Sequence, residues 1–410
     1  MWVASPTDRP GGAKFCRVAQ LTEESKERSV LRDHNLHVVF GVTLMAVLGA
    51  SSVGPALPKV ADELGVSSGQ VGLLITVFTL PGVVLTPIWG VLSDRYGRKK
   101  ILVPSLLLFG VAGASCALAR SFELLMVLRL VQGVGAAALG AINVTVIGDL
   151  YSGHERTEAM GYNSSVLSIG TAGYPVIGGM LATLGWYYPF ALPLVAVPIG
   201  LLVLFSLRNP EPAGDGGLKE YFGSVAKHLK DRRVIGLFAA SLVTFIILYG
   251  PQITYLPILM DQSFGASPLI TGAIVSSSSV VTALTATQLR RLTRLVSEKI
   301  LIRVAFVLYA VALCIVPLVP SLPLLLVATA VYGFAQGINI PNILSLLTGY
   351  APQENRGAIL SLNGTILRLG QTLGPLLMGL AAATLSIGGA YFAGAALAAA
   401  MFLVALILIR

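Results

Sequence analysis

Two arginines, Arg129 and Arg368, lie inside long apolar stretches of the sequence. A charged side chain near the centre of a membrane-spanning helix costs about 2.5–3.5 kcal/mol on insertion scales, so it is expected to face a wet cavity or a partner rather than lipid. Two roles are open for Arg368: a cationic anchor for an anionic or amphipathic ligand, or a structural residue that pairs with backbone carbonyls. We take the anchor as the first hypothesis, because a mid-membrane arginine marks a functional site by default.

Amide and hydroxyl side chains on the same stretches could line a cavity together with Arg368. Each of them alone is more simply explained as a contact between packed helices. As a set they fall on the fourth, seventh, tenth and eleventh apolar stretches, which would have to surround one cavity. The candidates for ligand binding are Asn143, Gln252, Tyr255, Asn339, Asn342 and Gln371, with Gln336, Tyr249 and Tyr332 as further lining.

Carboxylates are missing from the interior of these stretches. All 19 acidic residues lie outside them or near their ends. A membrane-buried Asp or Glu commonly attracts a cationic compound and carries a proton, so buried arginine without buried acid argues against a simple site for cations. The sequence shows no nucleophile–base pair, metal cluster or phosphate-binding loop either. We therefore expect neither an enzyme nor a bound cofactor or metal.

The composition indicates that membrane-spanning helices hold these residues. Charged residues make up 11% of the chain, against about 25% in soluble domains, and apolar residues make up 55%. A helix needs roughly 20 apolar residues to cross the hydrocarbon. Twelve stretches meet this requirement: 36–58, 70–92, 101–119, 122–147, 161–184, 188–207, 233–258, 268–289, 299–317, 322–347, 358–384 and 389–409. We expect an all-α integral membrane protein with twelve transmembrane helices.

The chain also repeats itself at about half its length. Arg156, Asn163, Gly170, Pro175 and Gly179 recur 200 residues later as Arg356, Asn363, Gly370, Pro375 and Gly379. The repeat predicts two pseudo-symmetric six-helix bundles, 36–207 and 233–410, with a cytoplasmic tail at 1–35 and a cytoplasmic linker at 208–232. Six spans per copy is an even number, so both copies enter the membrane in the same direction, as the halves of some transporters do.

The basic residues predict the orientation in the membrane. If the N-terminus is cytoplasmic, most of the 28 lysines and arginines fall on inner segments, and the outer joints hold only Lys59 and Arg120. This bias places both termini in the cytoplasm. An inner surface that faces anionic lipid then accounts for the net charge of +9, and no nucleic-acid partner is needed to explain it. We expect a monomeric, multi-pass protein of a bacterial or archaeal cell membrane.

A polar sequence between the second and third spans carries the strongest motif. It reads Gly90-Val-Leu-Ser-Asp94-Arg95-Tyr-Gly97-Arg98-Lys99-Lys100 and, together with the twelve-helix repeat, resembles the signature loop of the major facilitator superfamily. Gly90 would let a neighbouring helix approach, and Gly97 would permit a tight turn. Asp94 is suited to face a helix N-terminus of the other half, and Arg98 is suited to pair with Asp149. The resemblance implies a cytoplasmic gate formed by Gly90, Asp94, Arg95, Gly97, Arg98 and Asp149.

The fourth span holds a second motif. It reads Arg129-Leu-Val-Gln132-Gly133-Val-Gly135-Ala-Ala, which is similar to the Arg-x-x-Gln-Gly-x-Gly-Ala-Ala pattern of drug/proton antiporters in this superfamily. In those proteins the matching arginine is linked to proton coupling, so the resemblance implies this role for Arg129. The alternatives are a side chain that reaches the outer surface and one that pairs with Glu123.

The fifth span resembles a third motif, the glycine and proline pattern of exporters in this superfamily. Gly161, Gly170, Pro175, Gly178 and Gly179 match it, while Tyr174 stands where the pattern has glycine. Small residues at these spacings allow helices to pack closely, and proline bends the span. The resemblance implies that Gly170, Pro175, Gly178 and Gly179 belong to an export motif. Helix packing with no directional meaning is the alternative.

As a whole, the chain resembles the twelve-helix drug/proton antiporters of the major facilitator superfamily. The resemblance implies a secondary active transporter that works by alternating access and performs proton-coupled export of an amphipathic or anionic small molecule. A lipid or lysolipid transporter of the same superfamily is the alternative, and a membrane receptor that does not transport is a more distant one. Positions where the repeats differ are of most interest, since Arg368 stands where the first half has Ser168.

Overall fold

The computed structural model describes residues 30–208, 231–350 and 356–409. Within these ranges the regular secondary structure is helical, and twelve helices or runs of helices are long and apolar enough to cross a membrane. The expected all-α architecture with twelve spans is thereby confirmed. Most of the expected cytoplasmic segments, 1–29 of the tail and 209–230 of the linker, lie outside the described residues.

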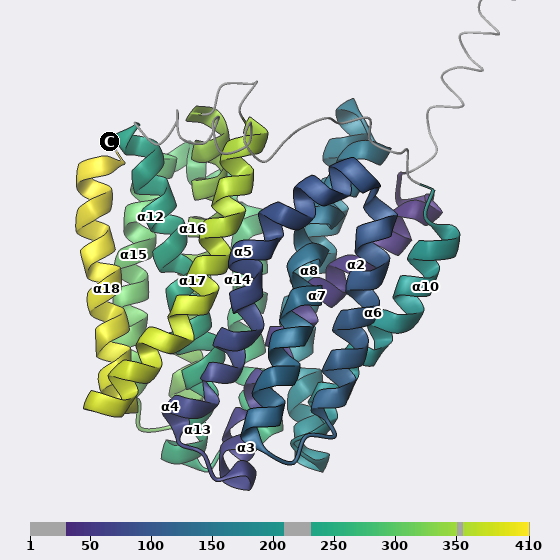
Figure 1. Ribbon diagram of the computed structural model, residues 1–410. Coiled ribbons are helices and arrows are strands. Elements are labelled where there is room, and N and C mark those ends of the chain that lie inside the picture. Colours follow the sequence, from purple (N-terminus) through teal and green to yellow (C-terminus); the bar gives the residue numbers. More distant parts are fainter. Residues whose placement is uncertain (1–29, 209–230, 351–355, 410) are drawn as a thin grey trace, which may run out of the picture.

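The helices run side by side between two ends of the molecule (Figure 1). One end, drawn at the top, holds the junction of α5 (Leu73–Tyr96) and α6 (Arg98–Cys116), and we call it the motif face. The other end holds α3 (Leu57–Leu64), α4 (Ser68–Val71) and α13 (Leu256–Phe264), and we call it the opposite face.

Each half contributes six of the spans. The first half further contains η1 (Val30–Arg32), α2 (His34–Ser51), η2 (Gly54–Ala56), α7 (Phe122–Leu150), α8 (Gly153–Leu184), α9 (Tyr188–Ala191), η3 (Leu192–Val195) and α10 (Ala196–Ser206). The second half further contains α12 (Arg232–Ile247), the π-helical segment η4 (Leu248–Tyr255), α14 (Pro268–Leu295), α15 (Glu298–Ile315), η5 (Val316–Leu318), α16 (Leu322–Tyr350), α17 (Arg356–Leu385) and α18 (Ile387–Leu408).

Several helices extend beyond the apolar stretches that predicted them. The fifth span starts at Gly153 instead of 161, and the seventh ends at Phe264 instead of 258. Hydropathy marks only the section that crosses the hydrocarbon, whereas a helix continues until its terminal backbone groups find other partners. Ser67, Ser121 and Ser267 are such partners, since each side-chain hydroxyl accepts a hydrogen bond from a backbone N–H in the first turn of a helix.

The first span of each half is interrupted at an equivalent place. In the first half α2 gives way to η2 at Gly54 and Pro55, and in the second half α12 continues into the π-helical segment around Pro251. Proline lacks an N–H group and its ring crowds the preceding turn, so it disturbs the regular hydrogen bonding. The two interruptions meet, because the carbonyl oxygen of Ile253 lies 2.9 Å from the position that a Cβ on Gly54 would take.

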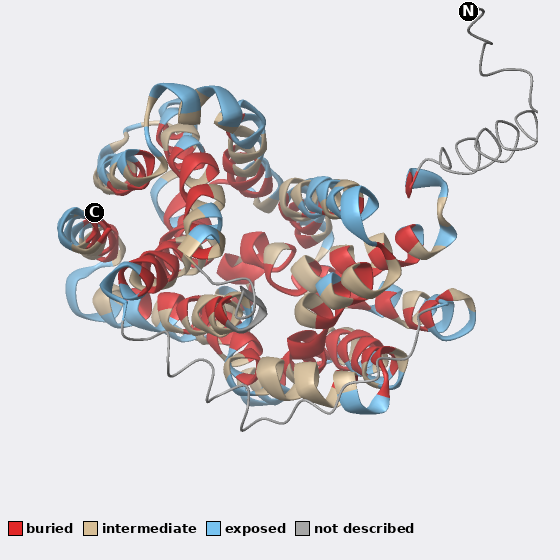
Figure 2. Ribbon diagram, turned by 90° about the horizontal axis from the view of Figure 1, so that it is seen from above, coloured by how far each residue is buried: buried red, intermediate tan, exposed pale blue. Residues whose placement is uncertain are grey.

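The buried apolar residues form two clusters. One is drawn from the first half and includes Phe109 and Leu139. The other is centred on the second half and extends into the first half through residues near the opposite face, such as Leu57 and Phe190. Seen from the motif face, buried residues lie inside the arrangement of helices and exposed residues outside it (Figure 2). Many exposed residues are large and apolar, as a surface in contact with lipid requires.

Candidate functional site

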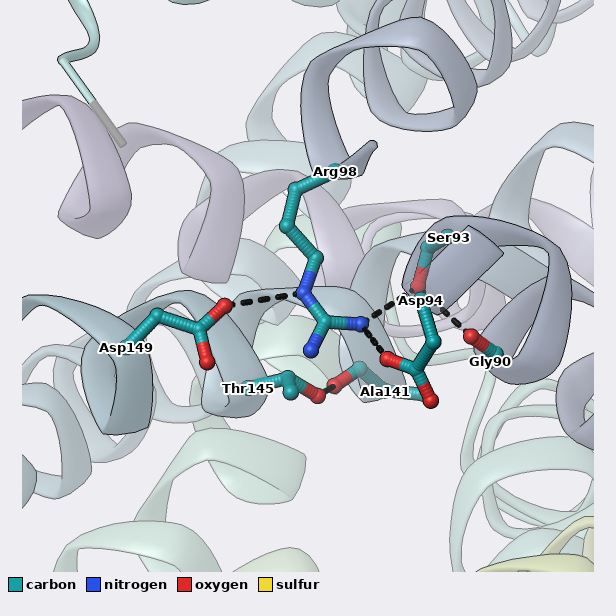
Figure 3. A network of polar contacts seen from close by, with 7 residues as sticks. All are labelled: Gly90, Ser93, Asp94, Arg98, Ala141, Thr145 and Asp149. Atoms are coloured by element: carbon teal, nitrogen blue, oxygen red, sulfur yellow. Dashed lines mark hydrogen bonds and ion pairs between the residues drawn. The ribbon is translucent and has the colours of Figure 1, made fainter. Parts of the chain in front are cut away.

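Arg98 forms the centre of a polar network at the motif face (Figure 3). Its Nε atom donates to Asp149 Oδ2 at 2.9 Å, and its Nη1 atom donates to Ser93 Oγ at 2.8 Å and to the carboxylate of Asp94. The side chain of Arg98 is only 6% exposed, so water screens these bonds weakly. The predicted pair of Arg98 and Asp149 is present, and it joins the start of α6 to the end of α7.

Three further residues of the signature loop, Gly97, Arg95 and Gly90, have different surroundings. Gly97 has a φ of +102°, a conformation that residues with side chains rarely adopt. Arg95 is exposed, and its guanidinium carbon lies 5.6 Å from the centre of the Tyr96 ring. The expected close approach of a helix at Gly90 is wrong for this structure, because nothing lies within 4 Å of the position of a Cβ there. The second half meets the first half elsewhere, from the level of Arg368 to the opposite face.

Asp94 bonds to Arg98 of its own half. Its expected contact with a helix N-terminus of the other half stays a prediction. The conformation described here therefore shows a network within the first half that ties α5, α6 and α7 together.

Arg129 is fully buried inside the first half. Its Nη2 atom donates to the carbonyl oxygen of Gly49 at 2.9 Å, Nε to that of Leu74 at 3.4 Å, and Nη1 to Gln132 Oε1 at 2.8 Å. The guanidinium carbon also lies 4.2 Å from the centre of the Phe78 ring, close enough for a cation–π attraction. Arg129 thereby connects α2, α5 and α7.

The surroundings of Arg129 differ from both alternatives that the sequence left open. The side chain does not reach the surface, and its hydrogen-bond acceptors are carbonyl and amide oxygens instead of Glu123. The glycines of the same motif explain why α7 comes so close to its neighbours. A Cβ on Gly133 would lie 2.2 Å from the carbonyl oxygen of Phe78, and one on Gly135 would lie 2.6 Å from that of Ser105.

Arg368 lies where the second half faces the first. Its Cδ atom is 3.0 Å from the position of a Cβ on Gly82 of α5, and its Nη2 atom is 3.2 Å from that of a Cβ on Gly140 of α7. Nη1 donates to Gln371 Oε1 at 3.1 Å, and Tyr249 is close enough to interact electrostatically. The side chain is partly exposed. Among the described residues, no Asp or Glu forms an ion pair with it.

Arg368 and Gln371 are the two predicted ligand-binding residues that the structure brings together. Asn143 donates through Nδ2 to Thr43 Oγ1, and Thr43 donates in turn to Asn163. The second half repeats part of this pattern, since Asn339 Nδ2 donates to Thr244 Oγ1 at 2.7 Å. These bonds join helices within one half, as the packing interpretation expects.

The remaining candidates are also buried. Gln252 Nε2 donates to Ser278 Oγ at 2.9 Å, Asn342 Nδ2 donates to the carbonyl oxygen of Ile338 at 2.6 Å, and Tyr255 has no exposed surface. In this conformation Asn143, Gln252, Tyr255, Asn339 and Asn342 expose little or no surface, and their part in a ligand site stays a prediction. We retain Arg368 and Gln371 as proposed contacts of a ligand.

The halves are also joined by hydrogen bonds between residues that belong to none of the sequence motifs. Thr372 Oγ1 donates to Thr79 Oγ1 at 3.0 Å, Thr76 Oγ1 donates to the carbonyl oxygen of Thr372 at 3.3 Å, and Gln262 Nε2 donates to Ser68 Oγ at 3.0 Å. These bonds run from the level of Arg368 to the opposite face. Threonines bonded to their own helix are common in this chain, so no sequence signal distinguished this set.

The glycine and proline motif of the fifth span also lies at the opposite face. A Cβ on Gly178 would lie 1.9 Å from the carbonyl oxygen of Ser52, and one on Gly179 would lie 2.3 Å from that of Pro268. The carbonyl oxygen of Pro175 is 2.1 Å from the position of a Cβ on Gly272. Helices therefore approach one another closely at this motif, and part of the contact is between α8 and α14 of the other half.

Metal-binding groups do not gather in the part of the chain that the structure describes. There, no three or more His, Cys, Asp or Glu side chains lie close enough to hold an ion. Cys116 is buried and Cys314 is half-buried, and neither forms a disulfide.

Comparison with known proteins agrees with this architecture. The sequence profile of the Major Facilitator Superfamily matches residues 39–262 and 252–410. The chain is 30% identical over 254 residues to the Bacillibactin exporter of Bacillus subtilis (strain 168), an alignment that covers 59% of this chain and 63% of the exporter. The chain thus spans less than two thirds of that relative's length.

Two further similarities extend over more of the chain. Multidrug resistance protein 1 of Bacillus subtilis (strain 168) is 27% identical over 344 residues, which cover 82% of this chain and 86% of that protein. The crystal structure of the nucleoside transporter NupG superimposes with a TM-score of 0.78 over 92% of this chain and 100% of that chain, at 13% identity. This last likeness shows a shared fold.

Proposed function

The chain belongs to the Major Facilitator Superfamily, and from this premise we propose that it is a secondary active transporter that exports an amphipathic or anionic small molecule in exchange for protons. The transporter works by alternating access, in which two bundles, 36–207 and 233–410, open a central site to one side of the membrane at a time. The observation that carries the proposal is the position of Arg368 between the two halves.

Arg368 has the properties of an anchor for an anion. Its guanidinium carries a permanent charge and presents donors in a fork that matches a carboxylate or a phosphate. Gln371 is the one side chain with a described hydrogen bond to that guanidinium, and it contributes no negative charge. Gly82 and Gly140 leave space beside Arg368 because they carry no side chains. A negatively charged group of the substrate would supply the missing counter-ion.

The named relatives support export as the direction. One is called an exporter and another a multidrug resistance protein. The glycine and proline motif at Gly178 and Gly179 resembles an exporter pattern, and it packs tightly at the opposite face. Proton coupling rests on the resemblance of Arg129 and its neighbours to the antiporter motif, and we propose that Arg129 takes part in it.

The orientation follows from the distribution of charge. We propose that the motif face is cytoplasmic in a bacterial or archaeal cell membrane, because the basic residues of the chain favour that side. Residues 208–232 would then link the bundles in the cytoplasm, and the Arg98 network would act as part of a cytoplasmic gate. We propose a monomer as the working unit, because the proposed site at Arg368 lies between the two halves of one chain.

Transport in proteoliposomes tests the function. The purified protein should exchange labelled organic anions by counterflow, and a proton gradient directed out of the vesicles, with an acidic interior, should drive accumulation of the anions inside against a concentration gradient. Arg368→Gln should abolish both activities at normal expression, whereas Arg120→Gln, a change at an exposed arginine of the opposite face, should have no effect.

Three panels of compounds distinguish the alternatives. Organic anions, organic cations and lysolipids are offered separately. Transport of cations that Arg368→Gln leaves unchanged would overturn the anion proposal. Transport of lysolipids without competition from soluble anions would favour the lipid transporter, and binding without counterflow of any compound would favour the receptor.

A further inference from the structure

Tyr255 ends the π-helical segment η4 and is fully buried near the opposite face. Its hydroxyl oxygen lies 2.9 Å from the position of a Cβ on Gly72 of the first half, and 2.6 Å from that of a Cβ on Gly379 of α17. No described residue forms a hydrogen bond with this hydroxyl. The tyrosine therefore fills a space that exists because two glycines surround it, and it fills that space without the bond that a buried hydroxyl normally finds.

The π-helical segment connects Tyr255 to the surroundings of Arg368. Tyr249, in the first turn of the segment, lies near Arg368 and packs against the apolar clusters of both halves. π-Helices are rare and frequently occur at functional sites. The eight residues of η4 therefore lie between the proposed substrate anchor and the contact at the opposite face.

Two hydroxyl groups stabilise the irregular backbone of this segment. Thr254 Oγ1 donates to the carbonyl oxygen of Tyr249 at 2.6 Å, and the hydroxyl of Tyr391 donates to that of Pro251 at 2.9 Å. Backbone carbonyls buried in a membrane need such partners. The irregular conformation of the seventh span is therefore stabilised by hydrogen bonds from η4 itself and from α18.

We propose that Tyr255 is a gating residue that closes the opposite face, and that the π-helical segment couples its position to the Arg368 site. In the arrangement described, the ring closes the gap between Gly72 and α17. A π-turn contains one residue more than an α-turn, so a change from π- to α-helical pairing would rotate the following α13 by roughly 100° and withdraw Tyr255. The coupling rests on the proposed function of Arg368, whereas the gating role of Tyr255 does not.

A pair of substitutions isolates the gating contact. A methyl group added by Gly379→Ala would meet the Tyr255 hydroxyl oxygen at 2.6 Å, while the next atoms are Gly69 O at 3.4 Å and Tyr255 Cζ at 3.8 Å. Tyr255→Phe keeps the ring and removes the oxygen. The double variant therefore restores the space that the single Gly379→Ala variant lacks.

The readout is the distance between spin labels at the exposed positions Glu63 of α3 and Ser263 of α13, measured without substrate. Gly379→Ala should raise the ratio of open to closed molecules at the opposite face by about five-fold. The double variant with Tyr255→Phe should return this ratio to within about two-fold of the parent. Gly173→Ala is the matched control, because Gly173 also lies in a helix and nothing lies within 4 Å of the position of a Cβ there. This variant should leave the ratio unchanged.

The outcomes separate the gate from the anchor. An unchanged ratio in Gly379→Ala, or a double variant as open as the single one, would overturn the gating role of Tyr255. Because this measurement needs no substrate, it stands even if Arg368→Gln proves to transport normally. The coupling through the π-helical segment is tested by Tyr391→Phe, which removes the hydrogen bond to the carbonyl oxygen of Pro251 and should increase the open population. The exposed control Tyr188→Phe should not increase this population. Equal open populations in the two variants would overturn the coupling.

Discussion

The guanidinium of Arg368 lies against Gly140 across the boundary between the two halves, with its Nη2 atom 3.2 Å from the position that a Cβ would take. A long cationic side chain of one half thus occupies the space left by a missing side chain of the other. The geometry of the proposed anchor therefore depends on how the halves meet, and a change in either partner should affect substrate binding.

Gly140→Ala should raise the KM for an anionic substrate by about five-fold, with expression and maximal rate close to those of the parent. The added methyl requires the guanidinium to move by a few tenths of an ångström, which weakens its alignment with the substrate. Initial rates of counterflow over a range of substrate concentrations measure this. Gly349→Ala, at an exposed helical position with nothing within 4 Å, is the control, and identical kinetics in the two variants would contradict the assigned geometry.

The Arg98 and Asp149 pair should show energetic coupling in a double-mutant cycle. Arg98→Ala leaves Asp149 without its ion pair, and Asp149→Ala leaves Arg98 with Asp94 as its remaining ion-pair partner, so each change should lower the free energy of unfolding by about 1–3 kcal/mol. The loss in the free energy of unfolding of the double variant should be clearly smaller than the sum of the losses of the two single variants. Thermal unfolding in detergent gives these values, with the exposed Arg95→Ala as control. Strictly additive losses would mean that the bond does not contribute to stability.

Thr372→Val should weaken the closure of the opposite face. The substitution removes the hydroxyl that donates to Thr79 Oγ1 across the halves, a bond worth about 0.5–1.5 kcal/mol, so the ratio of open to closed molecules should rise roughly two- to ten-fold. Thr384→Val on the same helix removes a hydroxyl that bonds only to α17 itself and should have no such effect. The spin-label pair at Glu63 and Ser263 reports both results.

Arg129→Gln should separate proton-driven transport from exchange. If Arg129 takes part in proton coupling, this variant loses accumulation driven by a pH gradient and keeps substrate counterflow, which needs no proton movement. The change also removes bonds to Gly49 and Leu74, so expression must be compared with that of the parent. Gradient-driven accumulation at the parental rate would refute the coupling role.

Much of the architecture could be predicted because the relevant signals are local or summed over many residues. Hydropathy averaged over a whole span identifies a membrane helix even when single positions deviate. Arg98 and Asp149 could be paired because both are charged residues at helix ends on the same side of the membrane. Gly97 could be assigned to a turn because few other residues adopt its backbone conformation.

The candidate site was harder to predict, as Gln252 and Asn339 illustrate. Both are polar residues within apolar spans, which is equally consistent with a cavity and with a bond to a neighbouring helix. The outcome depends on the rotation of each helix about its axis and on which helix lies beside it. In the structure the neighbours supply Ser278 and Thr244 as bonding partners, and both amides are buried.

The twelve spans, the repeat and the two arginines among apolar residues can be read from the amino-acid sequence alone, because lipid requires long apolar segments and penalises charge wherever it occurs along them. The different environments of the two arginines arise from the folded arrangement of the helices. Arg129 is enclosed because Gly49 and Leu74, on two other helices of its own half, turn their carbonyl oxygens toward it. Arg368 remains partly exposed because its neighbours across the boundary are glycines, which offer it space and no bond.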